Sequence, residues 1–461
     1  MTAALTALLL LGTIAALVLV ARKPEWGAPV FAFVIFIRLS DALRGEFGTP
    51  SVFQFLAPGL LLILVARWLL SGERVGEGWR PAVWLLAAYA AVCVLSILYA
   101  QDVERTGAEL MKQIDGVLIV IVMSSFIRGP QDLRRVVWAL LLAGLFLSSL
   151  TVFQQLTGSF ENNFAGFSRV ESRNLYGDKA GGRAEGPVSA NYYAILLVLI
   201  VPMAVDRLIN ERSGKLRAVA GFALLLFLSA IVFTYSRGAL VSLAVVGVML
   251  VIWLRMRWVV AVGVLALMIL PFVLPRDYLE RASTFTQVIG ILSGEAPRDS
   301  AIRGRLSEVT SAAMMFGDAP LFGVGYGNFE LHYPRYAREL ALDARRTDRA
   351  AHNLYLEVAA ETGVVGLSAF GLLLGYAVTG IGRARRRAEN AGDPDLARLV
   401  TGFGIGVVGY LTGSLFLHLS FPRYFWLLLG VAFGLEAIAR GAPQPVPEPL
   451  RLEPRGGEAP A

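Results

Sequence analysis

The sequence predicts an all-α membrane protein, a bundle of roughly 12 or 13 transmembrane helices with one long extracytoplasmic loop. Two observations lead to this fold class. The 461-residue chain is 56% hydrophobic and only 17% charged, whereas soluble globular domains carry about 25% charged residues. In addition, apolar stretches of about 17–25 residues recur from end to end, and each can cross a hydrocarbon core about 30 Å thick.

The expected spans follow from these apolar stretches. They lie near residues 3–21, 52–70, 81–99, 114–127, 136–156, 191–206, 216–234, 238–254, 258–275, 354–380, 399–418 and 422–439. A weaker stretch at 28–39 is too short to span alone, so the number of helices and the side of the N-terminus stay open. The first stretch has neither a basic start nor a clear small-residue cleavage site, so we expect a retained span rather than a signal peptide.

The basic residues predict which loops face the cytoplasm, because short loops rich in Arg and Lys stay on that side. Segments 207–217, 255–257 and 383–398 fit this rule, as do Arg128, Arg134 and Arg135. Counting helices then assigns the remaining loops to the outer face: 157–190, 234–238, 276–352 and 419–422. We therefore expect one transmembrane domain at 1–440, followed by a Pro- and Gly-rich disordered cytoplasmic tail at 441–461.

Composition argues against several other classes. The net charge of +7 is explained by the basic loops, and no aromatic-basic interleaving of the kind that binds nucleic acid is present. A lone cysteine, Cys93, and three scattered histidines make a poor metal site. The chain lacks a phosphate-binding G-x-x-x-x-G-K-[ST] loop, and the "DPD" at 393–395 is interpreted as a solvated turn. We expect neither a metal nor a cofactor.

Four polar clusters are expected together on the outer face. They are "GGRAEGPVSAN" with Arg183 and Asn191, "FTYSRGAL" with Arg237, "RGRLSEVTSAAMMFGDAPLFGVGYGNF" with Arg303 and Arg305, and "AHN" with His352. Taken singly, Arg237 is also explained as an interfacial anchor, the loop arginines as solvated charges, and His352 as a structural histidine. The prediction of a site depends on their convergence.

The residue types in these clusters indicate transfer chemistry with a diphosphate leaving group. Arginine keeps its charge and donates paired hydrogen bonds to phosphate. A lipid diphosphate would present phosphates at this depth of the membrane. Histidine accepts a proton near neutral pH, as a general base must.

On these motifs the chain resembles the O-antigen ligase and O-antigen polymerase superfamily of bacterial membrane glycosyltransferases. The likeness is carried by "TYSRGAL", the third cluster and "AHNLYLEVAAETGVVG", in that order, and covers roughly residues 180–420. The resemblance implies a helical glycosyltransferase fold of the C type, and glycan transfer from undecaprenyl diphosphate without metal. It also implies Arg237 and Arg305 as diphosphate-binding residues and His352 as the essential histidine. A tryptophan commonly follows the third motif's arginine, but Val309 stands there, so Arg303 competes with Arg305.

We accordingly expect His352 to take the proton from an acceptor hydroxyl while Arg237 and Arg305 neutralise the departing diphosphate. The substrate-binding candidates are Arg183, Arg303, Asn191, Tyr326, Asn328, Asn353 and Glu357. Glu357 and Glu361 share a helix face, so either one is a candidate to orient the histidine, although helix-start glutamates also suit the helix dipole.

Three activities fit the sequence. The favoured one is a polymerase of O-antigen or exopolysaccharide repeats in the bacterial inner membrane, with a periplasmic active site, a flippase and a chain-length regulator as partners. The second is a ligase that transfers polymer to lipid A core or to a protein. The third, from another class, is a transporter of an anion or of the lipid-linked glycan. Transporters bind substrate near the bilayer midplane, whereas the polar clusters here lie in outer loops.

Overall fold

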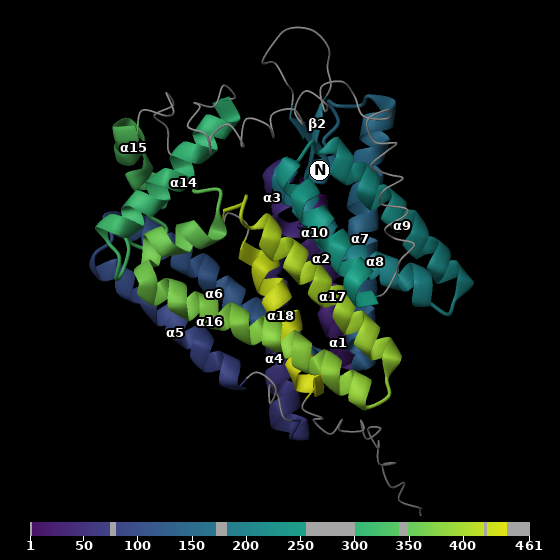
Figure 1. Cartoon of the computed structure of the whole chain (residues 1–461). Helices are drawn as coiled ribbons and strands as arrows, with labels where there is room; N and C mark the ends of the chain where they lie inside the picture. The colour runs from purple at the N-terminus through teal and green to yellow at the C-terminus, as the bar shows by residue number, and fades with distance from the viewer. Residues whose placement is uncertain are drawn as a thin grey trace, which may run out of the picture.

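The computed structural model describes residues 2–73, 80–171, 182–254, 300–340, 349–418 and 422–439, and it is helical almost throughout (Figure 1). The first half contains α1 (Thr2–Arg22), α2 (Gly27–Phe36), α3 (Leu39–Phe47), α4 (Val52–Ser71), α5 (Arg80–Leu95), α6 (Val103–Phe126) and α7 (Pro130–Thr157). The second half contains α8 (Ala190–Asn210), α9 (Gly214–Phe233), α10 (Arg237–Leu254), α14 (Ser300–Asp318), α15 (Phe329–Leu340), α16 (Leu354–Asn390), α17 (Pro394–Gly413) and α18 (Pro422–Ala439).

Short elements join these helices. Three 3-10 turns, η1 (Pro24–Trp26), η2 (Ser96–Leu98) and η3 (Phe164–Gly166), lie in the first half. Two short antiparallel strands, β1 (Arg169–Glu171) and β2 (Arg183–Gly186), pair with Glu171 opposite Arg183. The second strand ends shortly before α8 and packs against it.

The prediction of an all-α polytopic membrane protein is confirmed. Among the described residues, seven helices are long and apolar enough to cross a membrane, namely α1, α4, α7, α8, α9, α16 and α17. An eighth span results if α2 and α3, which meet at a bend of 44°, are counted as one. A helix lies at each expected span that the structure describes, while 258–275 and the tail 441–461 lie outside the described residues. The expected total of roughly 12 or 13 spans stays a prediction.

Helices α6 and α16 extend furthest beyond their apolar stretches. Helix α6 begins at Val103 rather than near 114, because the Asp102 carboxylate caps it by accepting the Arg105 N–H at 2.9 Å. Its first turns are amphipathic and carry charged residues, so hydropathy alone did not include them. Helix α16 likewise continues past 380 to Asn390 through a basic, polar end.

Helix α8 is the centre of one half of the bundle, and α7, α9, α10 and α17 pack around it. Most of its side chains are buried, which is the pattern of a helix that is apolar on every face. Small residues allow the close approach of α17: a Cβ atom at Gly406 would lie 2.1 Å from the Leu199 carbonyl oxygen. Helices α5, α6, α16 and α18 form a second group, in which α18 packs on α6 and α16.

The two ends of the bundle carry different kinds of loops. At one end, ion pairs join the loops expected in the cytoplasm, as in Arg212–Asp395 at 3.2 Å and Arg128–Glu73 at 2.6 Å. At the opposite end lie β2, α14 and α15, at the top of Figure 1. The expected inner loops therefore meet at one end, and their side of the membrane stays a prediction.

Candidate active site

His352 stands at the entrance to α16 in a constrained backbone conformation. Its φ of 49° lies in the left-handed region, which costs energy for a residue with a side chain. The next residue, Asn353, is the N-cap of α16, and its Oδ1 accepts the N–H groups of Tyr355 and Leu356 at 3.1 and 3.0 Å. The Leu354 N–H donates to the Ser414 carbonyl at 2.9 Å. These bonds hold the imidazole at a fixed place.

A buried carboxylate faces the histidine. The Nδ1 atom of His352 lies 3.1 Å from Oε2 of Glu308, whose side chain has 0% exposure. Arg349 Nε lies 3.0 Å from the other oxygen, Oε1. Both contacts are at ion-pair distance without the alignment of a good hydrogen bond. Glu308 thus lies between two donor side chains.

This contact assigns the histidine tautomer. Nδ1 also lies 3.0 Å from the Ala350 carbonyl oxygen. Since both neighbours of Nδ1 are oxygen acceptors, the ring proton belongs on Nδ1, and Nε2 carries the lone pair. The side chain of His352 is 29% exposed, so a substrate can reach the ring.

A second imidazole lies against the first. The His352 and His418 ring centroids are 5.0 Å apart with an interplanar angle of 74°. Burial, together with the neighbouring His352, lowers the pKa of His418 to about 3. His418 is therefore neutral at physiological pH and packs as an uncharged wall of the site.

Arg183 joins two of the polar clusters. Its Nε donates to the Thr234 carbonyl at 2.7 Å, and its Nη2 donates to Asn191 Oδ1 at 2.6 Å. Thr234 opens the turn between α9 and α10, and Arg237 is the first residue of α10. The guanidinium of Arg183, in β2, thereby connects the start of α8 to the turn that precedes Arg237.

Arg305 brings the third cluster to the same place. The pKa of its guanidinium is lowered by burial and then by the positive charge of Arg237, while Glu308 opposes this shift. Arg183 and Arg349 lower it further. Four arginines from separate segments therefore interact electrostatically beside the histidine.

Of the two competing arginines of the third motif, Arg305 is half-buried and interacts with Arg237, whereas Arg303 is exposed. The four arginines repel one another, and a bound anion would relieve that repulsion.

Tyr326 and Asn328 are held by other partners. Asn328 is fully buried, donates to Thr106 Oγ1 at 2.8 Å and accepts the Asp102 N–H at 2.9 Å. The Tyr326 N–H donates to Ser96 Oγ at 3.1 Å. Both residues thus fasten the turn after α14 to η2 and α6. Their expected contact with sugar stays a prediction, as do the binding roles of Asn191, Asn353 and Glu357.

The same turn is hydrogen-bonded to a break in α16. Gly363 interrupts the helix with φ 64° and ψ −166°. The carbonyls of Ala360 and Glu361, released by the break, accept the N–H groups of Val324 and Gly325 at 2.9 and 3.0 Å. Main-chain polar groups at this depth must find partners inside the protein. These hydrogen bonds fix α14, with Arg305 and Glu308, against the helix that follows His352.

Sequence reasoning missed Glu308. It named Glu357 and Glu361 only as candidates to orient the histidine, beside the helix-dipole explanation, and Glu361 Oε1 accepts the Phe329 N–H at 3.1 Å. The available signal was spacing: Glu308 follows Arg305 by three residues and so shares its helix face.

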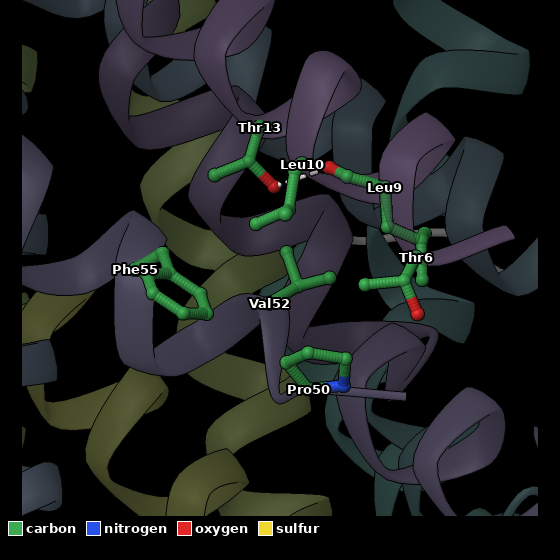
Figure 2. A pocket seen from close by; sticks show the side chains of 7 residues that line it. All are labelled: Thr6, Leu9, Leu10, Thr13, Pro50, Val52 and Phe55. Atoms are coloured by element: carbon green, nitrogen blue, oxygen red, sulfur yellow. Dashed lines mark hydrogen bonds between the residues drawn. The ribbon is translucent and has the colours of Figure 1, made fainter. Parts of the chain in front are cut away.

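Outside this region the described residues offer fewer groups that could bind or react. A small hollow between α1 and α4 is lined by Thr6, Leu9, Leu10, Thr13, Pro50, Val52 and Phe55, without a charged side chain (Figure 2). Within the described ranges, no three His, Cys, Asp or Glu side chains come together in a way that could hold a metal ion.

Comparison with known protein families matches one segment of the chain. Residues 222–371 match the family model of O-antigen ligase. The matched segment contains Arg237, Arg305, Glu308 and His352. The chain matches no curated protein sequence. The family match supports the resemblance to the O-antigen ligase and O-antigen polymerase superfamily, and the chain is a multi-pass membrane protein with a segment similar to O-antigen ligase.

Proposed function

We propose that the protein transfers a glycan from undecaprenyl diphosphate to a hydroxyl group of an acceptor saccharide during O-antigen or exopolysaccharide assembly. One observation carries this proposal: the guanidinium groups of Arg183, Arg237 and Arg305 interact beside the His352–Glu308 pair. A base next to an anion-binding cluster is what displacement of a diphosphate requires.

In the proposed step, the acceptor oxygen attacks the anomeric carbon of the donor sugar. The new carbon–oxygen bond forms as the bond from that carbon to the diphosphate breaks. The acceptor's proton passes to Nε2 of His352, and the bonding electrons leave with the diphosphate. A well-placed general base contributes about 10²- to 10⁴-fold in rate. Glu308, 3.1 Å from Nδ1, stabilises the imidazolium that forms.

The arginines act on the leaving group. Charge grows on the diphosphate as the bond breaks, so donors aimed at it stabilise the transition state more than the ground state. A hydrogen bond to a charged group contributes roughly 1.5–3 kcal/mol. The mutual repulsion of Arg237 and Arg305 makes an anion at this place more favourable still.

The test uses His352→Ala and Arg237→Ala in the full chain. Each change should abolish transfer from a lipid-diphosphate donor while membrane levels stay near normal. Wild-type activity in a protein carrying both changes would overturn the proposal. In proteoliposomes, counterflow of a labelled anion in place of glycan transfer would support the transporter instead.

The nature of the product tests the finer hypothesis. We retain polymerase as the more specific proposal, in which one lipid-linked repeat accepts the chain from another. Lengthened lipid-linked glycan would support it, whereas glycan on lipid A core or on a protein would identify a ligase.

A further inference from the structure

A second group of charged side chains lies outside the pocket described above. It consists of Arg38 and Asp41 at α3, Asp115 in α6 and Arg423 in α18, here called the Asp41–Asp115 cluster. Arg38 Nε donates to Asp41 Oδ2 at 2.7 Å, and Arg423 Nη1 donates to the same carboxylate at 3.1 Å. Arg423 Nη2 lies 3.6 Å from Asp115 Oδ2, an ion-pair distance rather than a hydrogen bond.

The position of this cluster is unusual for a structural ion pair. Asp115 lies midway along α6, one residue before Gly116, against which Trp426 of α18 packs. The cluster joins side chains of α3, α6 and α18, three elements that are far apart in the sequence. The four side chains are 25–38% exposed, so they line an accessible surface instead of a dry core.

Two connections link the cluster to segments of the histidine pocket. Arg38 Nη1 donates to the Pro187 carbonyl at 3.4 Å, and Pro187 follows the strand that carries Arg183. Arg423 follows His418 by five residues, which limits the separation of their Cα atoms to about 18 Å. The His418 ring in turn contacts the His352 ring. The cluster is thus linked to the chain next to Arg183 and to the segment that carries His418.

The charges of the two surfaces differ, and so does the ligand that each suits. The first gathers arginines and favours a diphosphate. The Asp41–Asp115 cluster has two positive and two negative groups, which balance. Partly exposed carboxylates accept hydrogen bonds from the hydroxyl groups of a saccharide, and guanidinium groups donate hydrogen bonds to its oxygens. Arg423 is also held over the Phe53 ring at 4.5 Å, which fixes its direction.

We propose that the Asp41–Asp115 cluster is the subsite that binds the acceptor saccharide and presents its hydroxyl to His352. This inference rests on the proposed glycan transfer and adds the place where the second substrate binds. Donor and acceptor then meet at the imidazole from different sides, with the charge of each surface matched to its substrate.

The experiment measures transfer in proteoliposomes with a lipid-diphosphate-linked oligosaccharide donor and two acceptor probes. The probes are a lipid-linked repeat unit and lipid A core oligosaccharide. For the probe that accepts glycan, Asp115→Asn and Asp41→Asn should each raise the acceptor KM about 10- to 100-fold, with the donor KM unchanged. Glu104→Gln, the same kind of change at an exposed position at the start of α6, is the matched control and should leave both constants at wild-type values.

The outcomes separate the two proposals. Acceptor KM values within twofold of wild type in both aspartate variants would overturn the subsite while leaving the proposed function intact. An equal rise in donor KM would overturn it as well. Failure of the wild-type chain to transfer to either probe would overturn the proposed function and the subsite together. The elution profile and the thermal midpoint of each variant show whether it is folded. Asp115→Glu keeps the negative charge and should therefore have an acceptor KM near the wild-type value.

Discussion

Replacing Glu308 by glutamine isolates the contribution of its charge to catalysis. The substitution keeps size and shape but removes the negative charge 3.1 Å from His352 Nδ1. Glu308 is fully buried, where weak dielectric screening strengthens electrostatic interactions. A hydrogen bond to a charged group contributes about 1.5–3 kcal/mol, and about 1.36 kcal/mol corresponds to tenfold in rate. We therefore expect kcat to fall about 10- to 100-fold with little change in the donor KM.

The assay is transfer of labelled glycan at saturating donor, with Glu339→Gln on the exposed face of α15 as the control. The thermal midpoint identifies structural damage in the variant. A kcat within twofold of wild type in folded Glu308→Gln would refute the reasoning, and so would an equal fall in Glu339→Gln.

Three further outcomes are expected. Arg305→Ala should lower transfer more than tenfold, whereas exposed Arg303→Ala should stay near wild type, and equal losses in initial rate would contradict the assignment. Gly323→Ala should lower the thermal midpoint, because its Cβ would lie 2.3 Å from the α16 backbone at a φ of 72°, while Gly317→Ala, with nothing within 4 Å, should not. Buried His418, with a pKa of about 3 against 6.5 when unfolded, destabilises the fold as pH falls below 6.5. The loss at pH 5 is about 2 kcal/mol, and a thermal midpoint equally acid-sensitive in His418→Gln would contradict it.

The fold class was predictable because a membrane span leaves a long apolar run in the sequence. The helix bounds were less predictable where charged residues continue a helix. In the first half of α6, Glu104, Arg105 and Lys112 lower the hydropathy, so an apolar stretch does not reveal this part of the helix. The break at Gly363 could not be foreseen either, since its released main-chain groups are satisfied by a turn distant in sequence.

The arginines and His352 were predictable as a group, because loops on one face of a bundle share a surface and arginine is rarely placed there without a role. Glu308 and the Asp41–Asp115 cluster were not. Their positions in the sequence are ordinary, and only the packing of α14 beside His352 and of α18 beside α6 gives them partners. The expected sugar contact of Asn328 stays a prediction, and the structure adds that its amide donates to Thr106 of α6, a contact that the sequence did not indicate.

The interruption of α16 has a mechanical consequence. Four main-chain hydrogen bonds couple the turn at 320–325 to the chain on both sides of Gly363, which makes α14 and the beginning of α16 one rigid body. A displacement of this end therefore moves the Arg305 guanidinium and the His352 imidazole together. Their spacing is preserved when either segment moves.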